Sequence, residues 1–130
     1  LGVPCTKPPW GNLTAIDLNT GDHLWQIPLG TSKDLAPFPF WWIKGAPNIG
    51  GPTVTASGLT FIAATSDFYL RAFNTQTGEE LAKFRLPTGG HATPMTYKTK
   101  NGRQIVVIAA GGHWAVGSPA SDHLIAFALP

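Results

Sequence analysis

A thirteen-residue segment occurs twice in the chain, and this repeat restricts the fold more than any other feature of the sequence. The first copy, LTAIDLNTGDHLW, begins at Leu13, and the second, LRAFNTQTGEELA, begins at Leu70, 57 residues later and without gaps. A shorter third copy, LIAFAL, begins at Leu124. Each full copy is an apolar run, a polar Thr-Gly turn and a second run. Repeats of roughly 40–50 residues built from short strands are typical of a β-propeller, and the longer spacing here predicts inserted loops.

Nine short runs predict strands, because each is rich in β-branched or aromatic residues and is bounded by Gly, Pro, Asn or Asp. The repeat groups them into two outer strands of one blade (13–29), a complete four-stranded blade (52–86) and three strands of a last blade (93–129). The total of about two and a quarter blades is too small to close a ring. We therefore expect an all-β chain, an incomplete β-propeller with antiparallel blades and no long helix. The predicted strands span residues 13–17, 23–29, 52–55, 59–64, 69–73, 81–86, 93–97, 104–110 and 123–129.

The connections between these strands fall into two classes. Tight Gly-containing turns join the first to the second strand and the third to the fourth strand of a blade. The other connections, at 31–51, 65–68, 88–92 and 111–122, are long or unusual in sequence. Because strand direction alternates, the second class is expected on one face, and functional residues are usually carried by loops of this kind.

The composition excludes several classes of protein. Charged residues are 12% of the chain, about half the usual share of roughly 25%, which argues against disorder. The 15 glycines and 12 prolines argue against a bundle of long helices. The nine Lys and Arg are scattered, so nucleic acid is not an expected partner. The single cysteine, Cys5, excludes an internal disulfide and a Cys-rich zinc site. No apolar run is long enough to span a bilayer, and the opening Leu-Gly suggests a piece of a longer protein.

The first copy of the repeat resembles the tryptophan-docking motif of pyrroloquinoline-quinone (PQQ) dehydrogenases, which are eight-bladed propellers that oxidise alcohols and sugars. It reads Ala15-x-Asp17-x-x-Thr20-Gly21-x-x-x-Trp25. The rest of the chain is similar to the carboxy-terminal end of the membrane-bound quinoprotein glucose dehydrogenase and quinate/shikimate dehydrogenase group. The segments that carry this resemblance are 50–65, 67–81, 86–97, 106–113 and 125–130. The chain departs from the family at Ala82, where Trp is expected, at His91, where Gln is usual, and over 114–121.

The resemblance implies that the parent protein oxidises a sugar or cyclic polyol with PQQ at the periplasmic face of the inner membrane. It also implies that the electrons pass to ubiquinone. In this family the catalytic base, the ligands of Ca²⁺ or Mg²⁺ and the membrane-spanning segment precede the carboxy-terminal blades. The chain alone is therefore expected to lack catalytic and metal-ligating residues, to be inactive and to associate through its open sheet edges. A non-enzymatic propeller scaffold and a sugar-binding module are the alternatives.

Two residues on the long loops are candidates for the site. Asp67 is either an Asx-turn residue or, as the resemblance implies, a carboxylate that faces the cofactor and tunes it. His113 follows two glycines that allow a sharp turn, and it is either a loop histidine or a hydrogen-bonding group for a hydroxyl-rich substrate. We expect the two side chains on one face, on neighbouring blades, turned toward the ring axis.

The aromatic residues favour structural roles. Trp25 is expected to fill the gap between two blades. Trp41 and Trp42, with Phe38 and Phe40, either cap one end of the propeller or contact membrane lipid or ubiquinone. The other histidines, at 23, 91 and 123, have no spacing that suggests a metal site.

Overall fold

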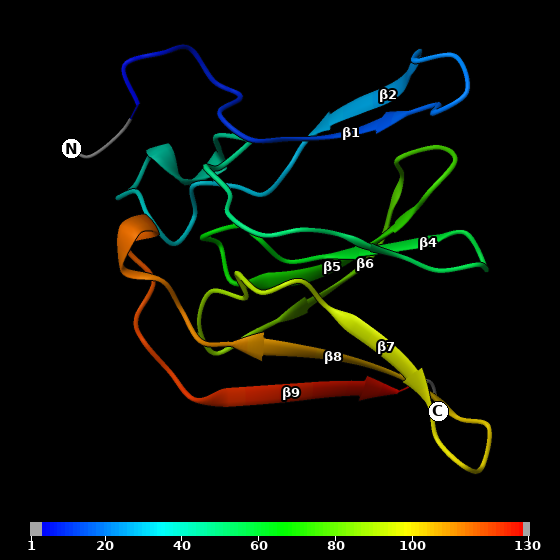
Figure 1. The fold of residues 1–130 in the computed structure, drawn as a ribbon. Helices are drawn as coiled ribbons and strands as arrows, with labels where there is room; N and C mark the ends of the chain where they lie inside the picture. The colour runs from blue at the N-terminus through cyan, green and yellow to red at the C-terminus, as the bar shows by residue number, and fades with distance from the viewer. Residues whose placement is uncertain (1–3, 129–130) are drawn as a thin grey trace.

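The computed structural model describes residues 4–128 and contains three antiparallel sheets and two short 3₁₀ helices (Figure 1). The predicted all-β class, an incomplete propeller, is confirmed, and the nine predicted strands are all present among the described residues. Most boundaries lie within one or two residues of the prediction, and the predicted end of the last strand, Leu129, lies outside the described residues. The strands are β1 (Asn12–Ile16), β2 (His23–Pro28), β3 (Thr53–Val54), β4 (Leu59–Ile62), β5 (Tyr69–Asn74), β6 (Glu80–Arg85), β7 (Met95–Lys98), β8 (Gln104–Ala110) and β9 (His123–Ala128).

The sheets follow the grouping that the repeat predicts. β1 and β2 form the first sheet, β3 to β6 the second in sequential order, and β7 to β9 the third. The three sheets lie one above another with their strands roughly aligned (Figure 1). Both full copies of the repeat also have the same register, since Ala15 pairs with Trp25 and Ala72 pairs with Ala82. A register shift follows each of these alanines, so the two hairpins share a bulge as well as a sequence.

The two ends of the sheets differ in how the chain turns. One end, which we call the turn end, carries tight turns at 17–22, 55–58, 74–79 and 99–103. Gly21, Gly58 and Gly102 in these turns have φ near +80° and open space around them. The opposite end, which we call the loop end, carries the segments 31–51, 65–68, 87–94 and 111–122, with η1 (Phe40–Trp42) and η2 (Trp114–Val116) (Figure 1).

Two separate hydrophobic cores hold the sheets together, one in each gap between neighbouring sheets. The first joins the first and second sheets through Leu13, Leu29, Ile62, Ala64 and Phe73. The second joins the second and third sheets through Ala63, Leu70, Leu86, Val106, Ile108 and Ala110. Because strand residues alternate between faces, β4 and β5 supply both gaps, and β5 reads as a nearly continuous buried run.

Trp25 closes the first gap at the turn end. Its indole ring packs against Gly78, where a Cβ atom would lie 2.8 Å from the ring. Its Nε1 donates a hydrogen bond of 3.0 Å to the carbonyl oxygen of Thr75. The 74–79 turn of the second copy of the repeat is therefore the surface on which Trp25 of the first copy packs. The structure gives Trp25 the inter-blade role that the sequence favours.

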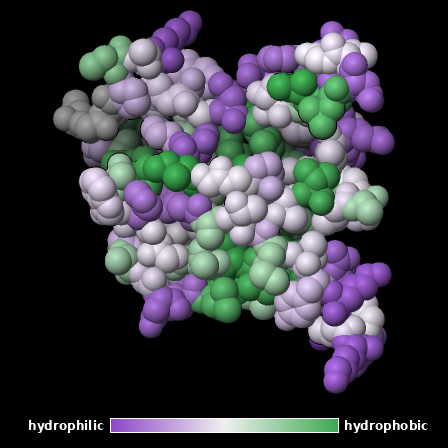
Figure 2. Space-filling model, in the orientation of Figure 1, coloured by the Kyte–Doolittle hydropathy of each residue, from purple (hydrophilic) through white to green (hydrophobic). Residues whose placement is uncertain are grey.

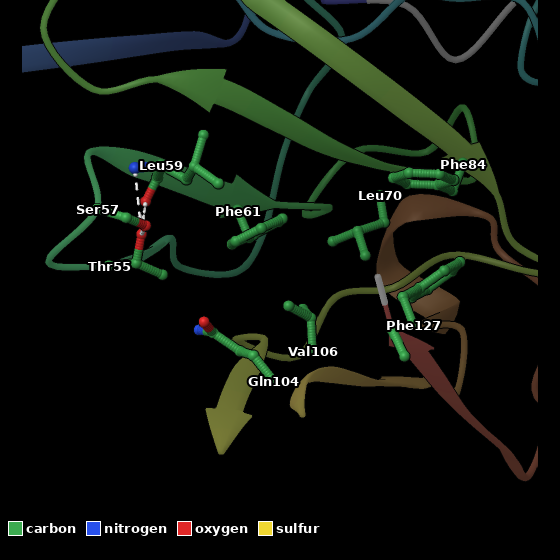
Figure 3. Close-up of a pocket in the computed structure, with 10 residues that line it drawn as sticks. Thr55, Ser57, Leu59, Phe61, Leu70, Phe84, Gln104, Val106 and Phe127 are labelled. Atoms are coloured by element: carbon green, nitrogen blue, oxygen red, sulfur yellow. Dashed lines mark hydrogen bonds between the residues drawn. The ribbon is translucent and has the colours of Figure 1, made fainter. Parts of the chain in front are cut away.

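The second gap has no counterpart of Trp25 among the described residues, because Ala stands at position 82. A cavity of about 130 Å³ lies in this gap, and Figure 3 shows its lining of side chains from the second and third sheets. Phe84 and Phe127 meet across it with ring centroids 5.0 Å apart. The other lining residues are Thr55, Ser57, Leu59, Phe61, Leu70, Gln104, Val106 and Ala128. The two interfaces are thus closed by different means, an indole on a glycine in one and paired phenylalanines in the other.

Candidate functional site

The long connections meet at the loop end and are tied to one another by isolated bridges. Thr31 pairs with Lys44, Asn48 with Thr65, and His113 with Ser118. The 31–51 segment thereby lies beside the Thr65–Phe68 loop, and the 113–118 loop closes on itself. The loop end is therefore an ordered surface on which side chains have defined positions.

Asp67 lies at the centre of a closed polar network. Its carboxylate pairs with the guanidinium of Arg71 through both oxygens, with Nη1 at 3.0 Å from Oδ1 and Nη2 in contact with Oδ2. Thr65 Oγ1 donates to Oδ1 at 2.6 Å, and the backbone N–H of Thr31 donates to Oδ2 at 2.8 Å. Asp67 is fully buried and Arg71 is 4% exposed. The carboxylate thus joins the second sheet to the loop that follows the first, and every oxygen accepts from protein donors.

The network keeps Asp67 ionised. Burial opposes ionisation, but the hydrogen bond and charge of Arg71, together with hydrogen bonds from Thr65 and Thr31, outweigh it and hold the pKa of Asp67 below its ordinary value of 3.8. The backbone on either side is in an unfavourable conformation, since Ala64 and Phe68 have φ of 57° and 56°. Non-glycine residues adopt this region at a cost of about 1–2 kcal/mol each, and the network is what offsets it.

His113 is half-buried at the start of η2 and has one ring nitrogen occupied. Its Nδ1 accepts a hydrogen bond of 3.3 Å from the backbone N–H of Ala115. The neutral ring therefore carries its proton on Nε2, which has no hydrogen-bond partner among the described residues. The ring stacks on Trp114, with centroids 6.0 Å apart. His113 therefore presents an N–H donor at the loop end.

His91 joins the loops that carry the two predicted residues, and sequence reasoning missed it. Its Nε2 lies 2.7 Å from Ser118 Oγ, and its Nδ1 lies 3.3 Å from the carbonyl oxygen of Ala64. A carbonyl only accepts, so Nδ1 carries the proton and Nε2 accepts from the serine hydroxyl. Its ring centroid is 6.2 Å from that of His113. No pattern in the sequence signals this role, because Ala64 and Ser118 each lie 27 residues from His91.

Backbone hydrogen bonds around His91 reinforce the connection. The N–H of Ala64 donates to the carbonyl oxygen of Gly90, and the N–H of Gly112 donates to that of Gly89. Thr88 Oγ1 donates to the carbonyl oxygen of Pro119 at 2.6 Å. The 88–91 segment therefore holds the Thr65–Phe68 loop on one side and the 111–119 loop on the other. Asp67 and His113 do not touch, and this segment links their loops.

The aromatic cluster of the 31–51 loop lies at the same end. Phe38, Phe40, Trp41 and Trp42 are all exposed, and no residue of η1 is buried. In Figure 2 a hydrophobic area interrupts the polar surface at the loop end, where Figure 1 places this segment. The cluster therefore faces outward instead of covering a core.

The described residues contain neither a metal-binding cluster nor a membrane-spanning helix. Within residues 4–128, no group of three or more His, Cys, Asp and Glu side chains is arranged to hold a metal ion. No helix in that part of the chain is long and apolar enough to cross a membrane.

Comparison with known proteins gives consistent matches. Residues 1–106 match the model of the glucose/ethanol/alcohol dehydrogenase β-propeller domain, PQQ. Over 99% of the chain, it is 49% identical to the quinoprotein glucose dehydrogenase of Escherichia coli (strain K12) and 52% identical to the quinate/shikimate dehydrogenase (quinone) of Acinetobacter baylyi. It covers only 17% and 16% of these relatives. The crystal structure of quinohemoprotein alcohol dehydrogenase from Comamonas testosteroni superposes on 85% of the chain with a TM-score of 0.61 and 30% identity.

Proposed function

Because the chain belongs to the family of PQQ β-propeller dehydrogenases that oxidise glucose, ethanol and other alcohols, we propose that it forms the last blades of such an enzyme. The observation that carries the proposal is identity near 50% to glucose and quinate/shikimate dehydrogenases over almost the whole chain. The parent protein then oxidises a sugar or a cyclic polyol. The electrons released pass to ubiquinone, and the reaction takes place at the periplasmic face of the inner membrane.

The loop end suits the rim of a PQQ pocket. PQQ bears carboxylates and quinone carbonyls, and the Asp67 carboxylate, through Arg71, Thr65 and Thr31, holds the Thr65–Phe68 loop at this rim. The loop end offers no cluster of ligands for the metal that accompanies such a cofactor within residues 4–128, so Ca²⁺ or Mg²⁺ is held by other blades. When bound, PQQ supplies the two-electron acceptor for oxidation of the alcohol. The chain by itself is expected to be inactive.

We assign different roles to the two loop-end residues. Asp67 is a positioning residue: its carboxylate and Arg71 fix the loop that borders the cofactor, and the hydrogen bonds and charge of Arg71 keep that carboxylate ionised despite its burial. His113 binds substrate, because Nε2–H can donate to a hydroxyl while Ala115 fixes the ring. Asp67→Asn in the parent should then depress turnover more than substrate affinity. His113→Asn should chiefly raise KM or change sugar preference.

A titration of the cofactor-free parent protein with PQQ tests the proposal. We expect dye reduction in the presence of glucose or quinate to rise to saturation as PQQ is added with Ca²⁺ or Mg²⁺. In the same assay His113→Asn should raise KM several-fold, since loss of one hydrogen bond is worth on the order of 1 kcal/mol. A parent that binds no PQQ would support a non-enzymatic scaffold instead. A His113→Asn variant with unchanged KM for every substrate would remove only the histidine role.

A further inference from the structure

Trp114 is the most exposed aromatic side chain among residues 4–128, and it lies directly after His113. Its exposed fraction is 89%, whereas that of Trp42 is 63%. An indole that stays in water forgoes the stabilisation that burial of so large a ring would give. Trp114 also belongs to the segment 114–121, where the sequence departs from the family. The residue is therefore particular to this chain, and its surroundings indicate what it contacts.

The backbone that carries Trp114 is fixed by hydrogen bonds at both ends of η2, which lies at the loop end (Figure 1). The N–H groups of Val116 and Ser118 both donate to the carbonyl oxygen of His113, each at 3.2 Å. The N–H of Gly117 donates to the carbonyl oxygen of Trp114 at 3.1 Å, and its φ of 72° ends the turn. The indole is thus exposed but carried on an ordered turn, so a ligand that contacts it pays little for ordering the loop.

The imidazole of His113 is held nearly parallel to this indole. The two ring planes are inclined by 18°, with centroids 6.0 Å apart. The ring of His91 meets the same imidazole edge-on, at 6.2 Å and 75°, and Nδ1 accepts from the N–H of Ala115. The orientation of the imidazole is therefore set. Since the Nε2–H bond lies in the plane of its own ring, it runs nearly parallel to the indole plane.

This arrangement suits a ligand that lies flat on the indole. Stacked atoms touch at about 3.5–4.0 Å, so a centroid separation of 6.0 Å places the imidazole to one side and leaves indole surface free. The aromatic face is electron-rich and attracts C–H groups, which cover the faces of a six-membered ring with equatorial hydroxyls. Equatorial hydroxyls project from the edge of such a ring, where a donor in the imidazole plane meets them. An open-chain polyol has no comparable flat face.

We propose that Trp114 selects cyclic substrates: its indole supports the C–H face of a six-membered cyclic polyol while Nε2–H of His113 donates to an equatorial hydroxyl. The proposal rests on the proposed function and assigns to one residue the choice between a ring and an open chain. Trp114 is then a specificity-determining residue that acts through binding and takes no part in proton or electron transfer. An open-chain polyol would have to be ordered before it could cover the same surface, which weakens its binding.

The test is calorimetric titration of the cofactor-free parent protein with D-glucose and quinate as ring probes and with sorbitol as the open-chain probe. Trp114→Ala should weaken binding of a ring probe about three- to tenfold, the range expected for one lost stacking contact, and leave the affinity for sorbitol unchanged. Trp114→Phe keeps a flat ring and should recover most of the loss. Leu18→Ala, which shortens a side chain 95% exposed at the turn end, is the control and should bind like the wild type.

The outcomes separate this proposal from the proposed function. A loss confined to the ring probes in Trp114→Ala and recovered in Trp114→Phe would support the role of the indole. Unchanged affinities, an equal loss for ring and open-chain probes, or a wild type that binds neither ring probe would overturn it. A lower melting temperature of Trp114→Ala with unchanged affinities would overturn it as well, because another blade of the parent then covers the ring. Dye reduction by the PQQ-loaded wild type tests the proposed function alone, so ring-selective binding without dye reduction would contradict only the dehydrogenase.

Discussion

Asp67 and Arg71 are each buried with a full charge, so each depends on the other. Glu80 contacts the same guanidinium at 3.1 Å, but it is 39% exposed and screened by solvent. Loss of the Asp67 charge would leave Arg71 buried against a single, weaker partner. Removal of one member of a buried ion pair typically costs about 3–5 kcal/mol. The pair is thus a point at which a single-atom change alters the stability of the loop end.

Asp67→Asn should destabilise the chain by about 2–4 kcal/mol at pH 7, since Glu80 retains part of the stabilisation of Arg71. The difference from wild type should shrink on acidification. The folded-state pKa of Asp67 is depressed, so its contribution is present above the ordinary value of 3.8 and is lost as pH falls through the lower folded value. Urea unfolding at pH 7 and at steps below pH 4 measures both effects. Asp22→Asn, at an exposed turn, is the control, and a constant difference at all pH values would contradict the assignment.

His91 should act as a positioning residue for the 111–122 loop, which carries His113, because it bonds to Ser118 on one side and to Ala64 on the other. In the parent enzyme His91→Leu should raise KM several-fold, and Ser118→Ala should have a similar but smaller effect. The double variant should be no worse than His91→Leu, since both remove the same hydrogen bond. His91→Gln keeps one donor and one acceptor and should restore most of the affinity. Additive effects of the two single changes would show that the histidine acts elsewhere.

At this scale the sequence predicted which residues lie at the loop end but not what they contact. The sequence suggested that Asp67 lies in an Asx-turn or faces a cofactor, but it did not show that the carboxylate accepts from Arg71, Thr65 and Thr31. The ion pair depends on how three segments meet, and local sequence patterns do not contain that information. The same holds for His91, whose two partners lie in loops that belong to the second and third sheets. Ser66 is buried, and its hydroxyl has no hydrogen-bond partner among the described residues, which likewise becomes visible only after the loops are packed.

Among the elements, the paired Thr-Gly turns of the repeat offer a natural comparison. Gly21 and Gly78 occupy equivalent positions, with φ of +80° and +74°. A Cβ atom at Gly21 would meet nothing within 4 Å, whereas one at Gly78 would meet the Trp25 ring at 2.8 Å. Both positions thus require a positive φ, and only Gly78 also requires the absence of a side chain, because Trp25 packs against it.

Gly78→Ala should therefore be more destabilising than Gly21→Ala. Both changes force a Cβ into the left-handed region at a cost of about 1 kcal/mol. Gly78→Ala additionally displaces the indole and strains its hydrogen bond to Thr75, which adds about 1–3 kcal/mol. Urea unfolding monitored by tryptophan fluorescence measures the difference. In a Trp25→Ala background the two glycine changes should become equal, and a persisting difference would contradict the packing explanation.

The elements themselves were largely predictable from the sequence. Runs rich in β-branched or aromatic residues and bounded by turn residues marked all nine strands, and the repeat predicted their order in the sheets. The shortest strand, β3, is shorter than the predicted strand 52–55, because only Thr53 and Val54 pair with β4. The 3₁₀ helices η1 and η2 were not predicted. Each is a single turn set by loop packing, and propensity carries little information over three residues.

For the whole molecule, the open sheet edges are the dominant feature. The first sheet has two strands and the third has three, so β9 and the strands of the first sheet present unpaired backbone groups. Such edges pair readily with other chains. In the parent protein the remaining strands of these two incomplete blades would pair with them. The chain alone should therefore self-associate.

Leu124→Lys should reduce this association. Leu124 lies on the edge strand β9 and is 73% exposed, so a lysine there places a charge beside the free edge without disturbing a core. Leu18→Lys is the matched control, because Leu18 is 95% exposed but lies in a turn. Light scattering over a concentration series should give a smaller average mass for Leu124→Lys alone. A wild-type chain that is monomeric at high concentration would contradict the expectation.

The separation of tight turns and long connections at opposite ends also bears on how such an enzyme could be attached to an electrode. A Cβ atom added at Gly58 or Gly102 would meet nothing within 4 Å, so a cysteine or short peptide inserted in these turns would leave both cores intact. A molecule immobilised through the turn end would present to the solution its loop end, where the proposed function places the substrate. Attachment through the loop end would instead bring the exposed aromatic residues of the 31–51 loop against the electrode. The same molecule could thus be attached in two orientations, one that favours access of the substrate and one that favours contact with the electrode.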